Sequence, residues 1–452
     1  MTEKIYKIES PPLRIKQLQG NLFQQIFNDP EIKSALNKTD EEYLHWEQLK
    51  YKTWIPQHLE KETFWTIVRL NRLLGAIDTP IQDCKGNFFK MNTNNYSNFL
   101  HIIDKEMAGN FMGITGLSEN DKRQFITRNI IEESIASSQL EGANTSRAVA
   151  KQMLLEGRKP VGHSEQMIVN NHKTMLLIEQ KLYKEDLSWD LISELHSMIT
   201  DRTLPKEKQG TLRETLDENG NKLVIKPWDN ETIVYEAPDK EFVALELTKL
   251  IDFANNKENK SAPFIHPVIK AIMLHFWIGL LHPFEDGNGR LARILFYWYM
   301  LKNDYWAFAY LSLSEKIKKS STQYAMAYIY SEQDGCDLTY FINYNINKIK
   351  LAQKDFQIYI TKKVKENQSI ISLSQHQFGC NQRQIKLLQY LHRKMESQTN
   401  IESHMKLYNV TKLTAINDLK DLVQKGFLTK RKLGRRVYYY PTEKISSIFK
   451  FS

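Results

Sequence analysis

The segment that decides the fold reads HPFEDGNGRLAR, from His282 to Arg293, and lies between two strongly apolar stretches. Gly287 and Gly289 stand on either side of Asn288, so the backbone can approach a ligand here without interference from a Cβ atom. A new helix is predicted to begin near Asn288 or Gly289. The N–H groups at the start of a helix have no partners within it, and the helix dipole favours negative charge there. This start would therefore bind an anion.

Charged side chains complete this segment. Arg290 and Arg293 are three positions apart on the predicted helix, so both can face one site, and guanidinium groups suit phosphate oxygens. Asp286 is a hard carboxylate beside that site, of the kind that holds Mg²⁺. His282 ends the preceding helix and is a titratable base that could take a proton from an attacking hydroxyl.

Each of these features has an ordinary structural explanation when it is taken singly. A single histidine at a helix end is most often structural, a Gly-x-Gly pair is weak evidence, and a basic helix start is usually a solvated surface. Here a base, a carboxylate, two glycines, an asparagine and two arginines fall within twelve residues. Their conjunction favours a site that handles phosphate.

The segment resembles the signature of the Fic family, H-P-F-x-[D/E]-G-N-G-R-x-x-R, at every defined position. The resemblance implies a protein adenylyltransferase, which transfers AMP from ATP to a Ser, Thr or Tyr hydroxyl of a target protein. It implies that His282 is the general base and that Asp286 is the Mg²⁺ ligand. It implies no role for Glu285. The implied ATP-binding residues are Gly287, Asn288, Gly289, Arg290, Arg293 and, by a match near the adenine on a predicted helix 321–328, Tyr324.

A second motif precedes the first. The stretch SSQLEG, from Ser137 to Gly142, fits the inhibitory pattern of the same family, [S/T]-x-x-x-E-[G/N], at the end of a predicted helix 121–142. The resemblance implies that Glu141 pairs with Arg293 and diverts it from the γ-phosphate. The structural alternative is an ordinary helix end with Gly142 just beyond it. The order of the two motifs favours the inhibitory interpretation.

A hairpin is predicted at residues 223–235, where two β-rich runs flank a polar turn. It resembles the flap of the family, which pairs with an extended target segment by strand addition. It follows Gly210-Thr211-Leu212-Arg213, which is similar to the G-x-x-R of the family. The sequence departs from the family in an apparent insertion at 217–221 and in Tyr235-Glu236-Ala237-Pro238, where a Y-x-P-P-like run is usual. The resemblance covers about residues 100–350.

Length and composition support a folded, mainly α-helical protein. The chain has 452 residues, enough for two or three domains, and 41% hydrophobic residues exclude wholesale disorder. We expect a helical N-terminal region at 1–115, a Fic core at 116–350, a helical linker at 351–380 and a winged helix-turn-helix domain at 381–448. The aromatic stripe of 41–54 is assigned to the core; it consists of Tyr43, Trp46, Tyr51 and Trp54.

The cysteines and the start of the chain bear on the compartment. Three widely spaced cysteines form neither a disulfide framework nor a metal knuckle. The first residues show no apolar signal segment, and the most apolar run, 271–281, is too short to span a membrane. We expect a cytoplasmic protein with no membrane contact.

The net charge of +9 comes from the C-terminal part of the chain. Residues 381–452 carry 15 Lys and Arg against 5 Asp and Glu. Three helices are predicted, at 382–394, 401–407 and 411–425, before a basic hairpin, and Leu413 and Leu419 of the third should face inward. This order looks like a winged helix, a DNA-binding plan. The predicted DNA-binding residues are Lys412, Thr414, Lys430, Arg431, Lys432, Arg435 and Arg436.

Alternatives remain at each level. The basic surface of the tail could be only solvated, and winged helices often contact proteins instead of DNA. The whole chain could be a transcription regulator whose Fic core senses nucleotide, or the same site could remove AMP, with Glu141 positioning a water. The intact signature favours the transferase, because pure sensing would not need His282. A homodimer is left open by the resemblance.

Overall fold

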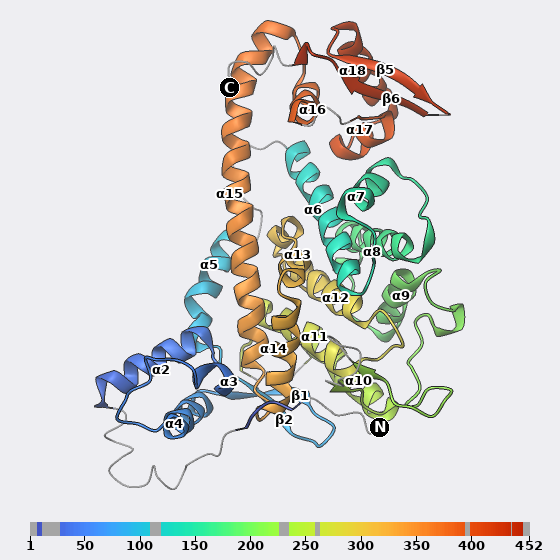
Figure 1. Cartoon of the computed structure of the whole chain (residues 1–452). Coiled ribbons are helices and arrows are strands. Elements are labelled where there is room, and N and C mark those ends of the chain that lie inside the picture. The colour runs from blue at the N-terminus through green and yellow to red at the C-terminus, as the bar shows by residue number, and fades with distance from the viewer. Residues whose placement is uncertain are drawn as a thin grey trace. The chain divides into compact units, whose positions relative to one another are not determined.

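The computed structural model describes residues 7–10, 28–108, 119–225, 235–257, 263–393, 398–434 and 436–445. Helices dominate these residues, and the strands among them form separate two-stranded antiparallel hairpins (Figure 1). This confirms the mainly α-helical fold. No helix in the described parts of the chain is long and apolar enough to cross a membrane.

The chain divides into two compact units, of which the first comprises residues 1–109, 177–305 and 316–350. Its helices are α2 (Pro30–Glu42), α3 (Trp46–Leu49), α4 (Lys61–Leu74), α5 (Ser97–Met107), α9 (Trp189–Thr200), α10 (Lys240–Ala254), α11 (Pro267–Leu281), α12 (Asn288–Lys302) and α14 (Ser321–Gln333), with short 3₁₀ turns η2 (Asn94–Tyr96), η3 (Leu182–Lys184) and η4 (Lys206–Lys208). Its hairpins are β1 (Ile77–Gln82) with β2 (Phe88–Met91) and β3 (Val224–Ile225) with β4 (Tyr235–Glu236).

The second unit comprises residues 110–176, 306–315 and 351–452. Its elements are α6 (Glu119–Leu140), α7 (Arg147–Glu156), η5 (Trp306–Tyr310), α16 (Gln382–Arg393), α17 (Ile401–Tyr408), α18 (Lys412–Gln424), β5 (Leu428–Leu433) and β6 (Arg436–Pro441). Three further helices contribute residues to both units: α8 (Gly162–Gln180), α13 (Leu313–Lys318) and α15 (Thr339–Phe378).

Helices α11 and α12 form the centre of the first unit. Both are buried along nearly their whole length, and they pack against each other. Helix α11 begins with Pro267 in its first position, where the missing N–H has no cost, and His266 caps it by accepting from the N–H of Val268 at 3.2 Å. The loop that joins the pair, residues 282–287, is thus carried by a rigid support.

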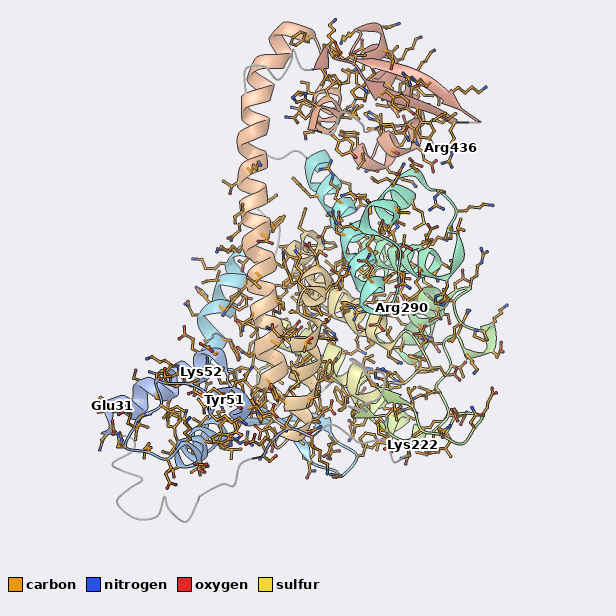
Figure 2. The ribbon with its side chains drawn as sticks, in the orientation of Figure 1. Glu31, Tyr51, Lys52, Lys222, Arg290 and Arg436 are labelled. Atoms are coloured by element: carbon orange, nitrogen blue, oxygen red, sulfur yellow. The ribbon has the colours of Figure 1, made fainter. Side chains whose placement is uncertain are left out.

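A buried polar network joins the N-terminal residues to the rest of the first unit. The hydroxyl of Tyr43 donates to Asp337 at 2.8 Å, and Arg72 donates to the hydroxyl of Tyr340 at 3.1 Å. Tyr43 is buried, as predicted for the aromatic stripe. The same prediction is wrong for Tyr51, labelled in Figure 2, because its side chain is 75% exposed. Helix α3 ends at Leu49, so Tyr51 lies beyond the helical face that packs inward.

Helix α6 ends as its sequence predicts. It runs from Glu119 to Leu140, and Gly142 follows in the left-handed conformation with φ of +91°. Ser146 then caps α7 by accepting from the N–H of Val149 at 3.4 Å.

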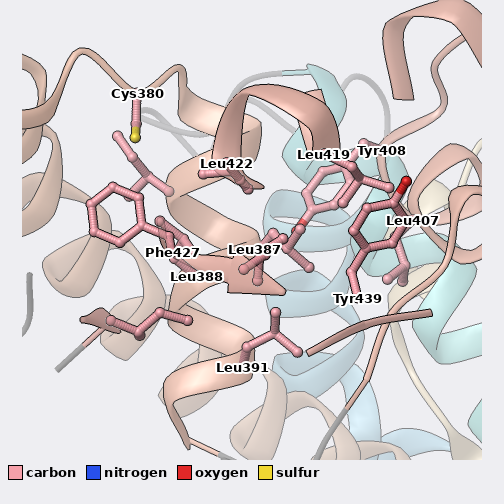
Figure 3. Close-up of a cluster of buried hydrophobic side chains, with 13 residues drawn as sticks. Cys380, Leu387, Leu388, Leu391, Leu407, Tyr408, Leu419, Leu422, Phe427 and Tyr439 are labelled. Carbon is pink, nitrogen blue, oxygen red and sulfur yellow. The ribbon is translucent and has the colours of Figure 1, made fainter. Parts of the chain in front are cut away.

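The predicted tail elements are present in order. Their apolar residues form one cluster that includes Leu388, Leu419 and Phe427 (Figure 3). Thr399 pairs with Tyr439 of strand β6 through two backbone hydrogen bonds. The N–H of Thr399 donates to the carbonyl of Tyr439 at 3.0 Å, and the N–H of Tyr439 donates to the carbonyl of Thr399 at 2.8 Å.

Two details of this tail differ from expectation. The prediction that Leu413 faces inward is wrong: it is 68% exposed, because the buried face of α18 is formed by Ala415, Asp418, Leu419 and Leu422. Asp418 is bonded there to Arg383 at 2.8 Å. The helical linker predicted at 351–380 is part of the longer α15, which begins at Thr339 within the first unit.

Candidate active site

The loop between α11 and α12 turns through two left-handed residues. His282 ends α11 with φ of 43° and ψ of 60°, and Gly287 precedes α12 with φ of 84°. A Cβ atom on Gly287 would lie 3.1 Å from Cγ2 of Thr200, so both the backbone angle and the space require glycine here. A histidine in the left-handed region is uncommon, and such strain often marks functional positions.

Pro283 decides how the ring of His282 is held. Proline has no N–H, so the carbonyl of Gly279, four residues earlier, has no backbone donor in the helical pattern. Nδ1 of His282 lies 2.7 Å from this oxygen and takes the place of that donor. A carbonyl only accepts, so Nδ1 carries the hydrogen and Nε2 is the basic nitrogen of the neutral ring. The geometry therefore suits the predicted role of a general base.

His196 of α9 supports the middle of the loop. Its Nε2 lies 2.8 Å from the backbone oxygen of Asp286, and its Nδ1 accepts from the N–H of Gly210 at 2.8 Å. The ring stacks on Phe284 with centroids 3.7 Å apart. Burial lowers the pKa of His196 to about 4, so the ring is neutral at physiological pH and donates from Nε2.

The sequence did not single out His196. It is one polar residue on the buried face of α9, a pattern that gives no sign of which distant loop it meets. The contact with Asp286 joins residues 90 positions apart.

Asp286 and Arg290 form an ion pair inside the loop. Nη2 of Arg290 donates to Oδ2 of Asp286 at 2.9 Å, and Nη1 donates to the carbonyl of Ile199 at 2.8 Å. Arg290 is fully buried among the helices of the first unit (Figure 2), whereas the side chain of Asp286 is 42% exposed. As placed, Arg290 orients the carboxylate of Asp286, and its predicted contact with ATP phosphates stays a prediction.

Asn288 ties the loop together through its side chain. Its Oδ1 accepts from the N–H of Phe284 at 3.0 Å, and its Nδ2 donates to the carbonyl of Phe284 at 2.7 Å. The side chain of Asn288 is thus engaged within the loop, and the anion binding predicted for Asn288 and Gly289 stays a prediction for their backbone amides in the first turn of α12. Gly287, as the N-cap, has no side chain to cover that turn.

Arg293 and Tyr324 share a neighbour, the fully buried His275 of α11. The hydroxyl of Tyr324 lies 2.7 Å from Nε2 of His275. Burial, with a smaller contribution from the positive charge of Arg293, lowers the pKa of His275 to about 3. Arg293 itself is buried, with 6% exposure. Tyr324 thus contacts α11 seven positions before His282.

The predicted inhibitory residues belong to the second unit. Ser137 is buried on α6, and Glu141 and Gly142 follow the end of this helix. The pairing of Glu141 with Arg293 stays a prediction.

The predicted DNA-binding residues also lie in the second unit, on α18 and the β5–β6 hairpin. Lys412 is exposed at the start of α18, and Thr414 is partly covered and bonds the hydroxyl of Thr411 at 2.9 Å. The basic residues of the hairpin are exposed: Lys430, Arg431, Lys432 and Arg436. Arg435 lies outside the described residues, as does most of the predicted flap, 226–234.

In the described part of the chain, no three His, Cys, Asp or Glu side chains gather where they could hold a metal ion. Magnesium commonly uses one or two carboxylates together with phosphates and water. Asp286 fits this mode, because Arg290 engages one carboxylate oxygen and the half-exposed side chain leaves the other for a ligand.

The oriented ring of His282 and the open start of α12 meet in one loop, which suits a phosphate-bearing ligand. Residues 186–300, which contain this loop, match the Fic/DOC family. This part of the chain is therefore similar to the Fic/DOC family.

Named relatives are distant. Protein adenylyltransferase fic-1 of Caenorhabditis elegans is 28% identical over 121 residues, which are 27% of this chain and 20% of the relative. The protein of the same name from Caenorhabditis briggsae is 23% identical over 175 residues, 38% of this chain and 31% of the relative. The matches thus span less than a third of either relative. A crystal structure of a Fic family protein from Desulfovibrio desulfuricans G20 superposes with a TM-score of 0.47 at 18% identity, over 77% of this chain and 95% of that one.

Proposed function

We propose that this protein transfers AMP from ATP to a Ser, Thr or Tyr hydroxyl of a target protein. The observation that carries the proposal is the orientation of His282, whose Nδ1–H is bonded to the carbonyl of Gly279 so that Nε2 is the base. A protein that only sensed a nucleotide would have no need for a basic nitrogen held in this way. The relatives named protein adenylyltransferase support the same reaction.

Each residue of the loop has a separate role in the proposed reaction. Nε2 of His282 takes the proton of the attacking hydroxyl as its oxygen bonds to the α-phosphorus. The bond from the α-phosphorus to the oxygen of the β-phosphate breaks, and pyrophosphate leaves. The backbone amides of Asn288 and Gly289 stabilise the charge on the phosphate oxygens, and Arg293 holds the terminal phosphates.

Asp286 is the residue that would hold Mg²⁺. The ion pair with Arg290 keeps its carboxylate oriented before any ligand binds. When bound, the cation would neutralise the negative charge of the ATP phosphates.

Glu141 would inhibit this site from the end of α6. A carboxylate that pairs with Arg293 occupies the place of the γ-phosphate and keeps ATP from its productive position. The left-handed Gly142 ends the helix directly after Glu141 and so fixes where the carboxylate is presented.

The position of the radiolabel in ATP tests the transfer. The Glu141→Gly variant is incubated with Mg²⁺ and ATP labelled at either the α- or the γ-phosphate, and Glu141→Gly with His282→Ala is the control. We expect protein-bound label from the α-phosphate only, and none in the control. Label from the γ-phosphate would indicate a kinase, and loss of AMP from a pre-labelled target without transfer would indicate AMP removal.

A second function is favoured by the surface of the tail. We propose that residues 381–448 form a winged helix that binds duplex DNA. The order α16, Thr399, α17, α18 and the β5–β6 hairpin supports it, because Thr399 bonds β6 as a first strand would. Lys412, Lys420 and the basic hairpin residues are exposed on α18 and the hairpin. Titration of a mixed-sequence duplex at low salt tests this proposal, and no binding would leave protein recognition as the role.

A further inference from the structure

The last carbonyls of α11 present a problem that the backbone alone does not solve. The carbonyl of Ile278 accepts from the N–H of His282 at 3.0 Å and so completes the helix. The next three carbonyls, of Gly279, Leu280 and Leu281, would need the N–H groups of residues 283–285. Pro283 has none, and the N–H of Phe284 bonds Oδ1 of Asn288 instead. Side chains must therefore satisfy this end of the helix.

The ring of His282 satisfies the first of these carbonyls, and Tyr235 satisfies the second. The hydroxyl of Tyr235 donates to the carbonyl of Leu280 at 2.5 Å. Tyr235 belongs to β4, where it pairs with Ile225 of β3 at the base of the β3–β4 hairpin. Its hydrogen bond spans 45 positions of the chain and reaches a residue two positions before His282.

Arg213 satisfies the carbonyls that follow. Its Nε donates to the carbonyl of His282 at 2.6 Å, and its Nη2 lies 3.4 Å from the carbonyl of Leu281. The same Nη2 donates to the carbonyl of Pro238 at 2.6 Å, three residues beyond Tyr235. The guanidinium is buried, with 5% exposure, and within the described residues its side-chain bonds go to carbonyls and not to a carboxylate.

We infer that Tyr235 and Arg213 are positioning residues for His282. They hold the three carbonyls that follow the one bonded to the His282 ring. The ring therefore keeps the carbonyl of Gly279 as its partner, and Nε2 stays the basic nitrogen. If the Tyr235 hydroxyl were absent, the buried carbonyl of Leu280 would lack its donor and would compete for the His282 ring. Reaction rates are sensitive to displacements of a catalytic group by about 1 Å, so a change in the partner of the His282 ring would lower the rate.

The same contacts connect the hairpin to the base. Both residues bind the chain at or just after β4 and the end of α11 at once. A target segment that pairs with the hairpin would therefore act on the backbone that carries His282. This inference deepens the proposed AMP transfer and rests on it for its effect on rate.

The test compares single substitutions in the Glu141→Gly background. Tyr235→Phe removes only the hydroxyl, and Arg213→Lys keeps the charge but not the fork that reaches several carbonyls. Tyr96→Phe is the matched control, because Tyr96 is a buried tyrosine of the same unit whose hydroxyl donates to Oδ1 of Asn343 at 3.1 Å. The measurements are the transfer rate at saturating ATP, the ATP concentration for half-maximal rate, and the ring ¹⁵N shifts of His282.

We expect Tyr235→Phe and Arg213→Lys to lower the transfer rate by on the order of tenfold or more while the half-saturating ATP concentration stays within about twofold. The ¹⁵N shifts of His282 should move from the Nδ1–H tautomer toward a mixture. Tyr96→Phe should lower the melting temperature without changing the rate or the shifts. Equal rates and unchanged shifts in Tyr235→Phe would overturn the inference.

The failure of the proposed function would look different. In that case the Glu141→Gly protein with Tyr235 intact would transfer no AMP at all. The ¹⁵N shifts would still decide whether Tyr235 fixes the His282 tautomer, because they need no turnover.

Discussion

The ring of His282 owes its orientation to its neighbour in sequence, since Pro283 leaves the carbonyl of Gly279 to the Nδ1–H. We expect His282→Ala to lower AMP transfer by about 10² to 10⁴-fold, because the general base is lost. The dissociation constant for ATP should change little, since the base acts on the incoming hydroxyl. Transfer kinetics and ATP titration measure the two effects separately. If the alanine variant labels its targets as fast as the parent, the assignment of His282 is wrong.

Glu332 of α14 predicts a pH dependence of stability. Burial raises the pKa of this carboxyl from 4.5 to about 8. Between these values the unfolded chain loses the proton and the folded chain keeps it, so the free energy of unfolding falls as pH rises, by up to about 1.4 kcal/mol per pH unit. Below pH 4.5 the carboxyl is protonated in both states, and its contribution to the free energy of unfolding is fully present.

Glu332→Gln should remove this dependence. Relative to the parent, the variant should be more stable at pH 8 than at pH 5, because glutamine has no proton to lose. Urea unfolding at both pH values measures the difference. A free-energy difference between parent and variant that is the same at pH 5 and pH 8 would show that Glu332 does not titrate in this range.

The sequence predicts the residues of the HPFEDGNGRLAR segment better than it predicts the distant residues that contact this segment. His282 and Asp286 stand in one short segment whose chemistry is legible without a structure. Tyr235 and His196 contact the same segment from 45 and 90 positions away. Such contacts depend on tertiary packing, and a tyrosine or histidine on its own carries no sign of its distant partner.

At the scale of elements, the end of α6 should set the degree of inhibition. Gly142 has φ of +91°, and a Cβ atom there would meet nothing within 4 Å, so Gly142→Ala changes only the backbone strain. We expect a loss of about 1 kcal/mol, fraying of the helix end beside Glu141, and a few-fold rise in self-labelling. Complete removal of the carboxylate in Glu141→Gly should raise it further.

Gly220 provides the control for this prediction. It has φ of +79° and equally open space around a Cβ atom, so Gly220→Ala carries a similar strain in an exposed turn. Self-labelling should stay at the parental level in this variant. An equal rise in both alanine variants would mean that general destabilisation, and not the position of Glu141, controls activity.

Apolar periodicity predicted the central elements well and the polar ones less well. The two apolar stretches on either side of the HPFEDGNGRLAR segment form α11 and α12, and α12 begins at Asn288 as predicted, because most of their residues are apolar and buried. Leu413 of α18 was placed inward because apolar residues usually are. Leu413 lies off the buried face of α18, and that face includes the polar Asp418. His404 and Arg383 supply hydrogen bonds that offset the cost of burying this carboxylate.

At the scale of the whole molecule, positive charge is concentrated in one part of the chain. Residues 381–452 carry 15 of the 62 Lys and Arg and only 5 of the 53 Asp and Glu. The exposed basic residues of the β5–β6 hairpin include Lys430, Arg431, Lys432 and Arg436. Arg431 also lies over the ring of Tyr440, with 5.3 Å between the guanidinium carbon and the ring centroid. The hairpin thus presents its charge on a paired, folded support.

Neutralising Lys430, Arg431, Lys432 and Arg436 together should weaken DNA binding and flatten its salt dependence. Each lost phosphate contact should lower the slope of log K against log salt by up to about 0.9, because fewer counterions are released. Fluorescence anisotropy of a labelled duplex over a range of salt concentrations measures this slope. The control neutralises four exposed lysines of the first unit, namely Lys33, Lys38, Lys105 and Lys181. If binding follows net charge alone, the slope of log K against log salt will fall equally in both variants, and the hairpin will have no special role. If the tail binds through this surface, only the hairpin variant will lose it, since contacts with phosphate are local even though the charge change is equal.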